Sequence, residues 1–591
     1  MMSALRQSRN LALALLLTVH WAAGVTISLQ PSRLSPWQVG GIVTWTATPD
    51  AGAQDALWYR FRARRIGSAF RVLKDFGPEN RVEWTDAEYP GTFEIEAAAR
   101  DRATGSVSVA TARYTLQSNA GADRPAIVPT SHPLVLLYSA PPCDPGSRMK
   151  VRFQSADGFT QDTGYKPCVG GLSINFYLAG LRAETEYFIY HIIDTGDTFE
   201  AGTVLTHTTG AVSADLPATT LLSAPPFGAA EPILLQENVF ASQLATDLAG
   251  RVVWYYPSAP LSFMTRPAGD GTFFGIIQDP QGDPWKQVLR EFNLVGMPLR
   301  ETNAGRVNEQ LKELGKRPIN AFHHEALRLP DGNIAVLAGV EQVLTNVQGA
   351  GAVNILGDVV VVLDTNLNLV WAWDSFDHLD VKRAATLGDQ CLPNACPPLQ
   401  LGRSANDWTH GNGIEATPDG NLLVSLRNQD WIVKINYDSG EGNGDVMWRL
   451  GAGGDFKLVS AVQNGWFSHQ HDPRFEPLSA DRLMVLDNGN VRRDTDPKAT
   501  TRGQVYQIDE QTKTATLVLN ADLGVYSLAV GSAERLSNGN YWFDAGFLPD
   551  ASGICNEVDS NGRNLFSVRT AAPVYRSYRL ASMYSAVRGS R

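Results

Sequence analysis

Short segments in which apolar and polar residues alternate dominate the first 117 residues. Residues 41–47, Gly-Ile-Val-Thr-Trp-Thr-Ala, and residues 91–97, Gly-Thr-Phe-Glu-Ile-Glu-Ala, both alternate in this way, and Pro, Gly and Asp turns separate such segments. A period of two puts every second side chain on one face of a strand. The pattern therefore predicts a β-sandwich module over residues 25–117.

The same alternation of apolar and polar residues predicts a second β-sandwich module over residues 118–222. Within it, Leu178-Ala-Gly-Leu181 is followed by Thr185-Glu-Tyr187. This spacing is typical of the tyrosine corner of fibronectin-like or immunoglobulin-like sandwiches, in which a Tyr hydroxyl ties a strand to the preceding backbone. Both modules are expected to be accessory domains or spacers.

From residue 223 to residue 591 the pattern becomes repetitive. The repeated unit is an apolar strand that ends near Asp, a turn, and a second strand that often carries Trp. Clear copies run over residues 245–254, 361–371 and 432–448, and weaker copies over 289–299, 506–519 and 566–578. Six copies in this length predict a six-bladed β-propeller.

A second repeat marks the turns of the predicted propeller. Residues 330–333 read Pro-Asp-Gly-Asn, with relatives at 418–421 and 537–540. Asp-Gly and Asn-Gly supply the positive φ angles that tight hairpins require. Helical periodicity is persuasive only over Glu309–Leu314, so the predicted fold class is all-β.

Composition narrows the class of partner. The chain is 43% hydrophobic and 19% charged, which is typical of globular proteins, and its formal net charge is -11. The chain has no extended Lys/Arg block, so it lacks the basic patch that is usual in a nucleic-acid-binding protein. We therefore expect small-molecule partners and no nucleic acid, while the oligomeric state stays open.

The first residues have the order of a secretory signal. Arg6 and Arg9 precede an apolar run over 11–19, and Ala22-Ala23-Gly24 follows it. The run is too short to span a bilayer, so residues 1–24 are predicted to be a signal peptide and the protein to be exported to the periplasm or secreted. No later run reaches the roughly 18 apolar residues of a membrane helix, so we expect no membrane insertion of the mature chain.

Export permits disulfides among the five cysteines. Cys143 and Cys168 bracket a turn-rich segment, and Cys391 and Cys396 bracket a Pro-containing loop. We predict these two bridges and a free Cys555. The four do not form the CxxC pairs of a zinc knuckle.

Three histidine segments each precede a propeller turn. They are Phe322-His-His324, His410-Gly-Asn412 and His469-Gln-His471, and His324, Asn412 and His471 lie six residues before Pro330, Pro418 and Pro477. Equivalent positions of different blades converge on the central channel of a propeller. The three segments are therefore expected to form one site.

An arginine ends the strand that follows the second segment. Residues 422–426 are largely apolar, and Arg427 comes next. A guanidinium donates two parallel hydrogen bonds, so together with imidazoles and the Asn412 amide it would suit a tetrahedral oxyanion.

Four segments resemble the signature segments of the bacterial arylsulfotransferases, the aryl-sulfate sulfotransferase family. They are Asp407-Trp-Thr-His-Gly-Asn412, Ser425-Leu-Arg427-Asn-Gln429, Gln470-His471-Asp472 and Phe322-His-His-Glu325. The resemblance covers roughly residues 226–591. The loop with Cys391 and Cys396 is similar to the family's short disulfide, whereas about 200 residues precede this propeller in place of one small β domain.

The resemblance implies a ping-pong transfer of a sulfuryl group from an aryl sulfate ester to a phenolic acceptor, without a nucleotide sulfate donor and without a cofactor. His471 would be the nucleophile and carry the sulfuryl group as sulfohistidine. Arg427, His410, Asn412 and His324 would bind the sulfuryl oxygens. His323 is an alternative to His324 for this role. His469 and Asp472 would either orient His471 or have no chemical role.

Two alternatives remain. Histidines that converge on a channel also suit a metal-dependent hydrolase or oxidoreductase, but Arg427 in the same cluster disfavours a dication, so we expect no metal. A non-catalytic extracellular binding propeller is the other alternative, and it gives no reason for the register of the histidines.

Overall fold

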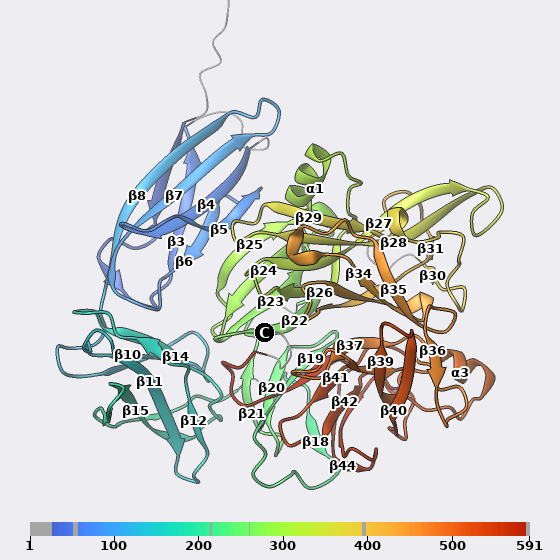
Figure 1. Cartoon of the computed structure of the whole chain (residues 1–591). Coiled ribbons are helices and arrows are strands. Elements are labelled where there is room, and N and C mark those ends of the chain that lie inside the picture. Colours follow the sequence, from blue (N-terminus) through green and yellow to red (C-terminus); the bar gives the residue numbers. More distant parts are fainter. Residues whose placement is uncertain (1–25, 51–56, 213–214, 259–260, 393–397, 587–591) are drawn as a thin grey trace, which may run out of the picture.

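The computed structural model describes residues 26–50, 57–212, 215–258, 261–392 and 398–586 (Figure 1). The predicted signal peptide over 1–24 lies outside these residues. Strands dominate the described chain, which confirms the all-β prediction. Within it, no helix is long and apolar enough to cross a membrane.

Three short α-helices interrupt the strands: α1 (Ala304–Glu313), α2 (Ser375–His378) and α3 (Asn490–Thr495). The helix predicted over 309–314 is the second half of α1. That helix begins five residues earlier because the Asn303 side chain caps it by accepting a hydrogen bond from the Arg306 N–H.

The first module packs two sheets around one hydrophobic cluster. Its centre is Trp45, Trp84 and Tyr114, whose rings meet edge to face. One sheet contains β1 (Ile27–Pro31), β3 (Val43–Pro49) and β6 (Arg81–Trp84). The other contains β2 (Trp37–Gln38), β4 (Leu57–Arg65), β5 (Arg71–Gly77), β7 (Gly91–Asp101) and β8 (Val107–Gln117).

The second module is also built from two sheets. One contains β9 (Ala126–Pro129), β10 (Leu136–Ala140) and β14 (Ile174–Leu178). The other contains β11 (Arg148–Ser155), β12 (Thr160–Asp162), β13 (Lys166–Pro167), β15 (Glu186–Asp194), β16 (Phe199–Ala201) and β17 (Leu205–Thr208). The Tyr187 hydroxyl accepts a hydrogen bond from the Arg182 N–H at 2.9 Å, so the predicted tyrosine corner is present.

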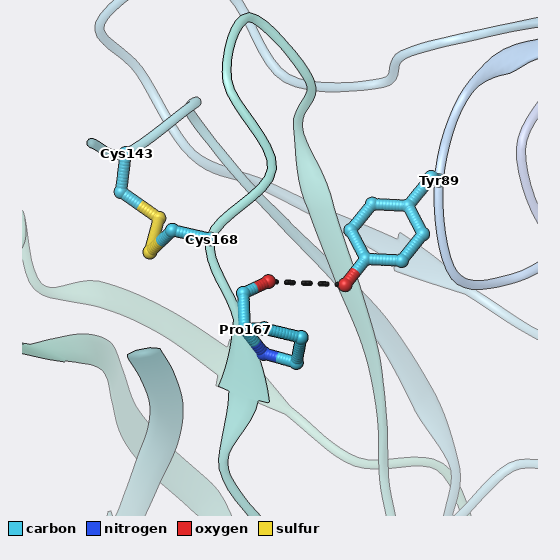
Figure 2. Close-up of a disulfide and its surroundings, with 4 residues drawn as sticks. All are labelled: Tyr89, Cys143, Pro167 and Cys168. Carbon is cyan, nitrogen blue, oxygen red and sulfur yellow. Dashed lines mark hydrogen bonds between the residues drawn. A yellow bond between two sulfur atoms is a disulfide. The ribbon is translucent and has the colours of Figure 1, made fainter. Parts of the chain in front are cut away.

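Cys143 and Cys168 form the predicted disulfide in this module, with 5.4 Å between their Cα atoms. Beside it, the Tyr89 hydroxyl of the first module donates to the Pro167 carbonyl at 3.0 Å (Figure 2). Cys391 is buried, and its predicted partner Cys396 lies outside the described residues. Cys555 is free, as predicted, and it is buried.

Residues 219–580, called here the six-sheet domain, contain six sheets of at least four strands each, and the second is continuous with a sheet of the first module through β5. The first sheet contains β19 (Ile233–Asn238), β20 (Leu244–Asp247), β21 (Val252–Tyr255) and β45 (Val574–Leu580). The second contains β22 (Phe263–Gly269), β23 (Thr272–Ile277), β24 (Val288–Asn293) and β25 (Pro298–Asn303). The third contains β26 (Phe322–Arg328), β27 (Ile334–Thr345), β28 (Ala352–Leu363), β29 (Leu369–Asp374), β30 (Gln390–Cys391) and β31 (Ala405–Asp407).

The fourth to sixth sheets continue in chain order. The fourth contains β32 (Gly411–Ala416), β33 (Leu422–Leu426), β34 (Trp431–Ile435) and β35 (Val446–Gly451). The fifth contains β36 (Lys457–Val459), β37 (His471–Phe475), β38 (Arg482–Asp487), β39 (Arg502–Asp509) and β40 (Thr514–Asp522). The sixth contains β18 (Thr219–Leu221), β41 (Ala533–Arg535), β42 (Tyr541–Ala545), β43 (Gly553–Val558) and β44 (Asn564–Thr570).

The edge strands of successive sheets lie against one another. Strand β22 contacts β26, β26 contacts β32, β32 contacts β37, and β37 contacts β41. Strand β45 is linked to both neighbouring sheets: the Arg579 N–H donates to Glu534 of β41 at 2.9 Å, and the Tyr575 ring meets Phe263 of β22 at 5.2 Å. The six edge strands β22, β26, β32, β37, β41 and β45 thus contact one another in succession.

The predicted hairpin turns join these edge strands to their neighbours. Gly332, Gly420 and Gly539 of the repeated turn have φ angles of 88°, 80° and 86°, which favour glycine. The turns connect β26 to β27, β32 to β33 and β41 to β42.

Both N-terminal modules rest on the six-sheet domain. Strand β5 pairs in parallel with β25 at Lys74 and Glu301, and the Asn303 side chain donates to the Phe76 carbonyl at 2.9 Å. In the second module, Arg182 forms an ion pair with Asp247 of β20 at 2.9 Å. The two modules are therefore docked on the second and first sheets.

Candidate active site

The predicted site residues sit at breaks in the register of the edge strands. Pairing shifts between Phe322 and Ala326 around His324, and between Gly411 and Gly413 around Asn412. It also shifts immediately after His471. Bulges of this kind re-aim side chains near functional sites.

Several non-glycine residues of the site have a left-handed backbone. The φ angles of His324, His410 and Asp472 are 57°, 50° and 49°. Such conformations cost on the order of 1–3 kcal/mol each and persist only where the surroundings fix them. Their recurrence in the third, fourth and fifth sheets indicates one built site.

His324 faces the other site residues. Its ring centroid lies 5.0 Å from that of His410, 5.7 Å from Tyr575 and 4.9 Å from Phe263. Burial, and next the neighbouring His323, hold the pKa of His324 well below its ordinary value. The imidazole is therefore neutral at neutral pH.

His323 is turned toward a buried carboxylate. Its Nε2 lies 3.1 Å from Asp358 Oδ1, and its Nδ1 lies 2.8 Å from Nδ1 of His324. If Nε2–H donates to Asp358, Nδ1 of His323 accepts the proton of His324. His323 thus orients His324, which itself contacts His410.

His410 forms a carboxylate–imidazole pair. Its Nδ1 lies 2.6 Å from Oδ2 of Asp407, which is the last residue of β31. The proton is therefore held on Nδ1, and Nε2 is the ring nitrogen available to a ligand. The side chain of His410 is 25% exposed, which makes it accessible.

His471 is buried between two hydrogen-bond partners. Its Nδ1 lies 2.7 Å from Asn488 Oδ1, and its Nε2 accepts a hydrogen bond from the Val530 N–H at 3.2 Å. Because an amide oxygen only accepts, the proton is on Nδ1 and the lone pair is on Nε2. Burial, and next the positive charge of Arg427, hold the pKa of His471 well below its ordinary value.

Arg427 and His469 share one carboxylate. Arg427 Nη1 lies 3.3 Å from Asp389 Oδ1, and His469 Nε2 lies 3.2 Å from Asp389 Oδ2. The other ring nitrogen of His469 contacts Asp430 at 3.0 Å. Burial opposes protonation of His469, but the hydrogen bonds to Asp389 and Asp430 outweigh it and raise its pKa.

The side-chain amide of Asn412 forms a hydrogen bond within the protein. Its Nδ2 donates to the Gln470 carbonyl at 2.8 Å, which ties β32 to the segment that carries His471. The backbone carbonyl of Asn412 accepts hydrogen bonds from the Tyr575 hydroxyl at 3.1 Å and from the Arg576 side chain at 2.8 Å. In this arrangement the amide nitrogen positions the neighbouring segment.

Sequence reasoning missed five contributors: Asp389, Asn488, Val530 and Tyr575, and the role of Asp407. Asp407 begins the segment 407–412 that resembles a family signature, and it lies three residues before His410. This position is the one sequence signal for its role. Asp389, Val530 and Tyr575 lie at least 59 residues along the chain from the histidines that they contact, so no local pattern marks them. Asn488 is nearer, because it follows β38, the strand that pairs with β37, 17 residues after His471.

A buried ionic network underlies the site. Arg576 contacts Glu325 at 2.5 Å and Asp472 at 3.7 Å, and Arg266 contacts Glu325 at 3.4 Å. Arg266 also pairs with Glu415, and all these side chains are at most 4% exposed. The network links strands β45, β22, β26, β32 and β37, so it fixes the edge strands that carry the site.

Within the described parts of the chain, no group of three or more His, Cys, Asp or Glu side chains is arranged to hold a metal ion. The histidines here contact carboxylates, an amide and each other.

Comparison with family models gives the class first. Residues 124–212 match the model described as the arylsulfotransferase Ig-like domain, which places an Ig-like domain at the second module. Residues 197–579 match the model described as arylsulfotransferase (ASST), a family of transferases that act on small aryl substrates. The chain belongs to the arylsulfotransferase family.

Other comparisons add little. No curated protein matches the chain. The chicken CNTN1 FN1–FN3 domains match at 14% identity over 31% of this chain and 64% of that one, with a TM-score of 0.13. A two-domain fibronectin type-III segment of chicken tenascin matches at 13% identity over 32% of this chain and 99% of that one, with a TM-score of 0.14.

Proposed function

We propose that this protein transfers a sulfuryl group from an aryl sulfate ester to a phenolic acceptor by a ping-pong mechanism through a sulfohistidine at His471, independently of any nucleotide sulfate donor. The arrangement around His471 carries the proposal. The ring is neutral, its single proton is held by Asn488, and its Nε2 lone pair faces a peptide N–H. This is the protonation state that a nucleophilic imidazole requires.

In the first half-reaction Nε2 of His471 attacks the sulfur of the ester. The Nε2–S bond forms as the bond from sulfur to the aryl oxygen breaks, and the phenol oxygen leaves with the bonding pair. Attack requires Nε2 to exchange its 3.2 Å contact with the Val530 N–H for the sulfur. The Asn488 oxygen, at 2.7 Å from Nδ1, stabilises the positive charge that develops on the ring.

Polar groups around His471 would hold the oxygens on sulfur. Arg427, His410 and His324 are the side chains for this role, and the Val530 N–H becomes a donor once Nε2 has bonded to sulfur. Val530 has a φ of 57°, which is unusual for a β-branched residue and aims its N–H into the site. Asn412 contributes by holding the segment that carries His471.

His410 is suited to the proton transfers. Backed by Asp407, His410 would act as an imidazolium whose Nε2–H protonates the departing phenol oxygen; the Nε2 lone pair left behind would then remove the proton of the acceptor phenol and restore the imidazolium. The acceptor oxygen then attacks the sulfur, the Nε2–S bond breaks, and His471 is restored. Dividing one transfer into two steps lets donor and acceptor use one site in turn.

For the scaffold we propose a six-bladed β-propeller over residues 223–591, preceded by two sandwich modules. The contacts of successive edge strands, and those of β45 with both β41 and β22, support a closed ring. A structural disulfide supports export to the periplasm or beyond, with residues 1–24 as the signal peptide.

The test compares wild type with His471→Ala, using 4-nitrophenyl sulfate as donor and a phenol as acceptor. Wild type should release nitrophenol and carry a sulfo group, detected by mass spectrometry, on the peptide that contains His471. His471→Ala should lose both, whereas the control His207→Ala, in the second module, should keep both. Full activity of His471→Ala would exclude this nucleophile, and loss of wild-type activity to EDTA would favour a metal-dependent reaction.

A further inference from the structure

The carboxylate of Asp389 lies beside Arg427, the side chain expected to bind an anionic substrate. Its two oxygens contact different basic side chains of the site, Arg427 at 3.3 Å and His469 at 3.2 Å. Asp389 immediately precedes β30 in the segment between β29 and β31, and its carbonyl accepts from the Asp407 N–H at 3.1 Å. The segment is therefore anchored beside the Asp407–His410 pair.

Asp389 is charged under all assay conditions. Burial alone would raise its pKa, but the hydrogen bond from His469 and the charge of Arg427 lower the pKa to about 2. One positive charge, that of Arg427, is thus already neutralised by the protein. His324 and His471 add no charge, because the pKa values of both lie well below the ordinary value.

Other carboxylates near the site also contact histidines. Asp430 contacts His469 and Asp407 contacts His410. Asp389 is the one carboxylate among these three that contacts Arg427, the guanidinium expected to bind the ester. Its charge therefore acts directly on the residue that attracts the substrate.

We propose that Asp389 is a specificity-determining residue that makes the site select sulfate monoesters over phosphate monoesters. The proposal rests on the proposed function. A sulfate monoester carries one negative charge at neutral pH, whereas a phosphate monoester carries nearly two. By neutralising Arg427, Asp389 leaves the site too little positive charge for a dianion, while a monoanion is still held by hydrogen bonds.

Removing this charge should favour the dianion. With an effective dielectric constant near 20 and several ångströms between charges, loss of one negative charge should strengthen phosphate-monoester binding over sulfate-monoester binding about 10- to 100-fold. A residue that only positioned Arg427 and His469 would change the binding of both esters in parallel.

The experiment uses the full chain as wild type, Asp389→Asn, Asp389→Ser, Asp389→Glu and Asp380→Asn. Asp380 lies in the same segment, exposed, and its side chain contacts the Lys382 N–H, so it is the matched control. We would measure kcat/KM for 4-nitrophenyl sulfate, inhibition by 4-nitrophenyl phosphate, and calorimetric binding of inorganic sulfate and phosphate at one pH. Asp389→Ser supplies a second neutral side chain in case Asp389→Asn does not fold.

Either neutral variant should shift the phosphate-to-sulfate preference about 10- to 100-fold toward phosphate in both inhibition and binding. Asp389→Glu and Asp380→Asn should keep the wild-type ratio. An unchanged ratio in the neutral variants, or equal loss of both ligands, overturns the proposal. Absence of turnover and of a sulfo group in wild type would instead overturn the proposed function, and the binding measurements would still decide the role of Asp389.

Discussion

Replacing Asn488 by Asp should raise the pKa of His471 and so extend the protonated form of its imidazole to higher pH. In the native protein the neutral amide oxygen of Asn488 accepts the Nδ1 proton at 2.7 Å, and nothing stabilises a second proton on Nε2. A carboxylate at the same position favours the imidazolium. Since the imidazolium has no lone pair on Nε2, the variant should lose the nucleophile on the acid side of its new pKa.

The size of the effect follows from the contact. Two unit charges about 4 Å apart interact by about 4 kcal/mol at an effective dielectric constant of 20. At about 1.4 kcal/mol for each pH unit, this raises the pKa of His471 by about three pH units. Wild type, in which the pKa of His471 is well below the ordinary value, should show no loss of activity from this group as pH falls from 9 to about 6.5.

The assay is the pH dependence of kcat/KM for 4-nitrophenyl sulfate. For Asn488→Asp, the rate should rise about tenfold with each pH unit below the new pKa and level off above it. Asn488 also donates to the Ser527 and Val530 carbonyls, each at 3.1 Å, and Asp cannot replace these bonds. Asn490→Asp is the control, because Asn490 donates to Leu528 of the same loop at 3.1 Å without contacting His471.

The control variant should keep the wild-type pH profile even where its stability is lower. If Asn488→Asp has the same profile as wild type, the reasoning that places a neutral His471 at the centre of the reaction is refuted. A profile shifted equally in both variants would attribute the effect to the loop instead.

Two further predictions concern stability. Replacing Cys143 and Cys168 by Ser opens a loop that spans 25 residues of sequence, which should lower the free energy of unfolding of the second module by about 3.5 kcal/mol; urea denaturation measures this, and a midpoint equal to that of the oxidised wild type would contradict it. Glu325→Gln removes a partner of both Arg576 and Arg266 in the buried network, so the variant should be destabilised by about 3–5 kcal/mol. Thermal unfolding tests this, and an unchanged melting temperature would show that the network contributes little.

Much of the fold could be predicted because it depends on local patterns. Alternation of apolar and polar residues identifies strands, Asp-Gly and Asn-Gly identify hairpins, and the spacing before Tyr187 identifies the tyrosine corner. Strand β18 shows the limit: its three residues fell in the predicted second module, yet they pair with β44 of the six-sheet domain. A segment so short has no periodicity, and its partner lies about 350 residues further along the chain.

The candidate site divides in the same way. The register that places His324, Asn412 and His471 alike is a property of each hairpin, so it is readable from the sequence. The contact of Tyr575 with His324 depends on which strands are neighbours in space, whereas Asn488 reaches His471 from the end of the next strand of the same hairpin. Asp389 carries no signal at all, because only the folded chain brings it to Arg427 and His469.

Strand β45 sets the order in which the domain can be completed. During synthesis β19, β20 and β21 emerge early, but the strand that pairs with the free edge of β19 emerges only after the other five sheets. Until then β19 presents an open edge, which is a template for mispairing and aggregation. Tyr575, which contacts His324, arrives with the same strand. A nascent or truncated chain therefore holds the histidines without Tyr575 beside His324, and we expect activity only when the last strand is in place.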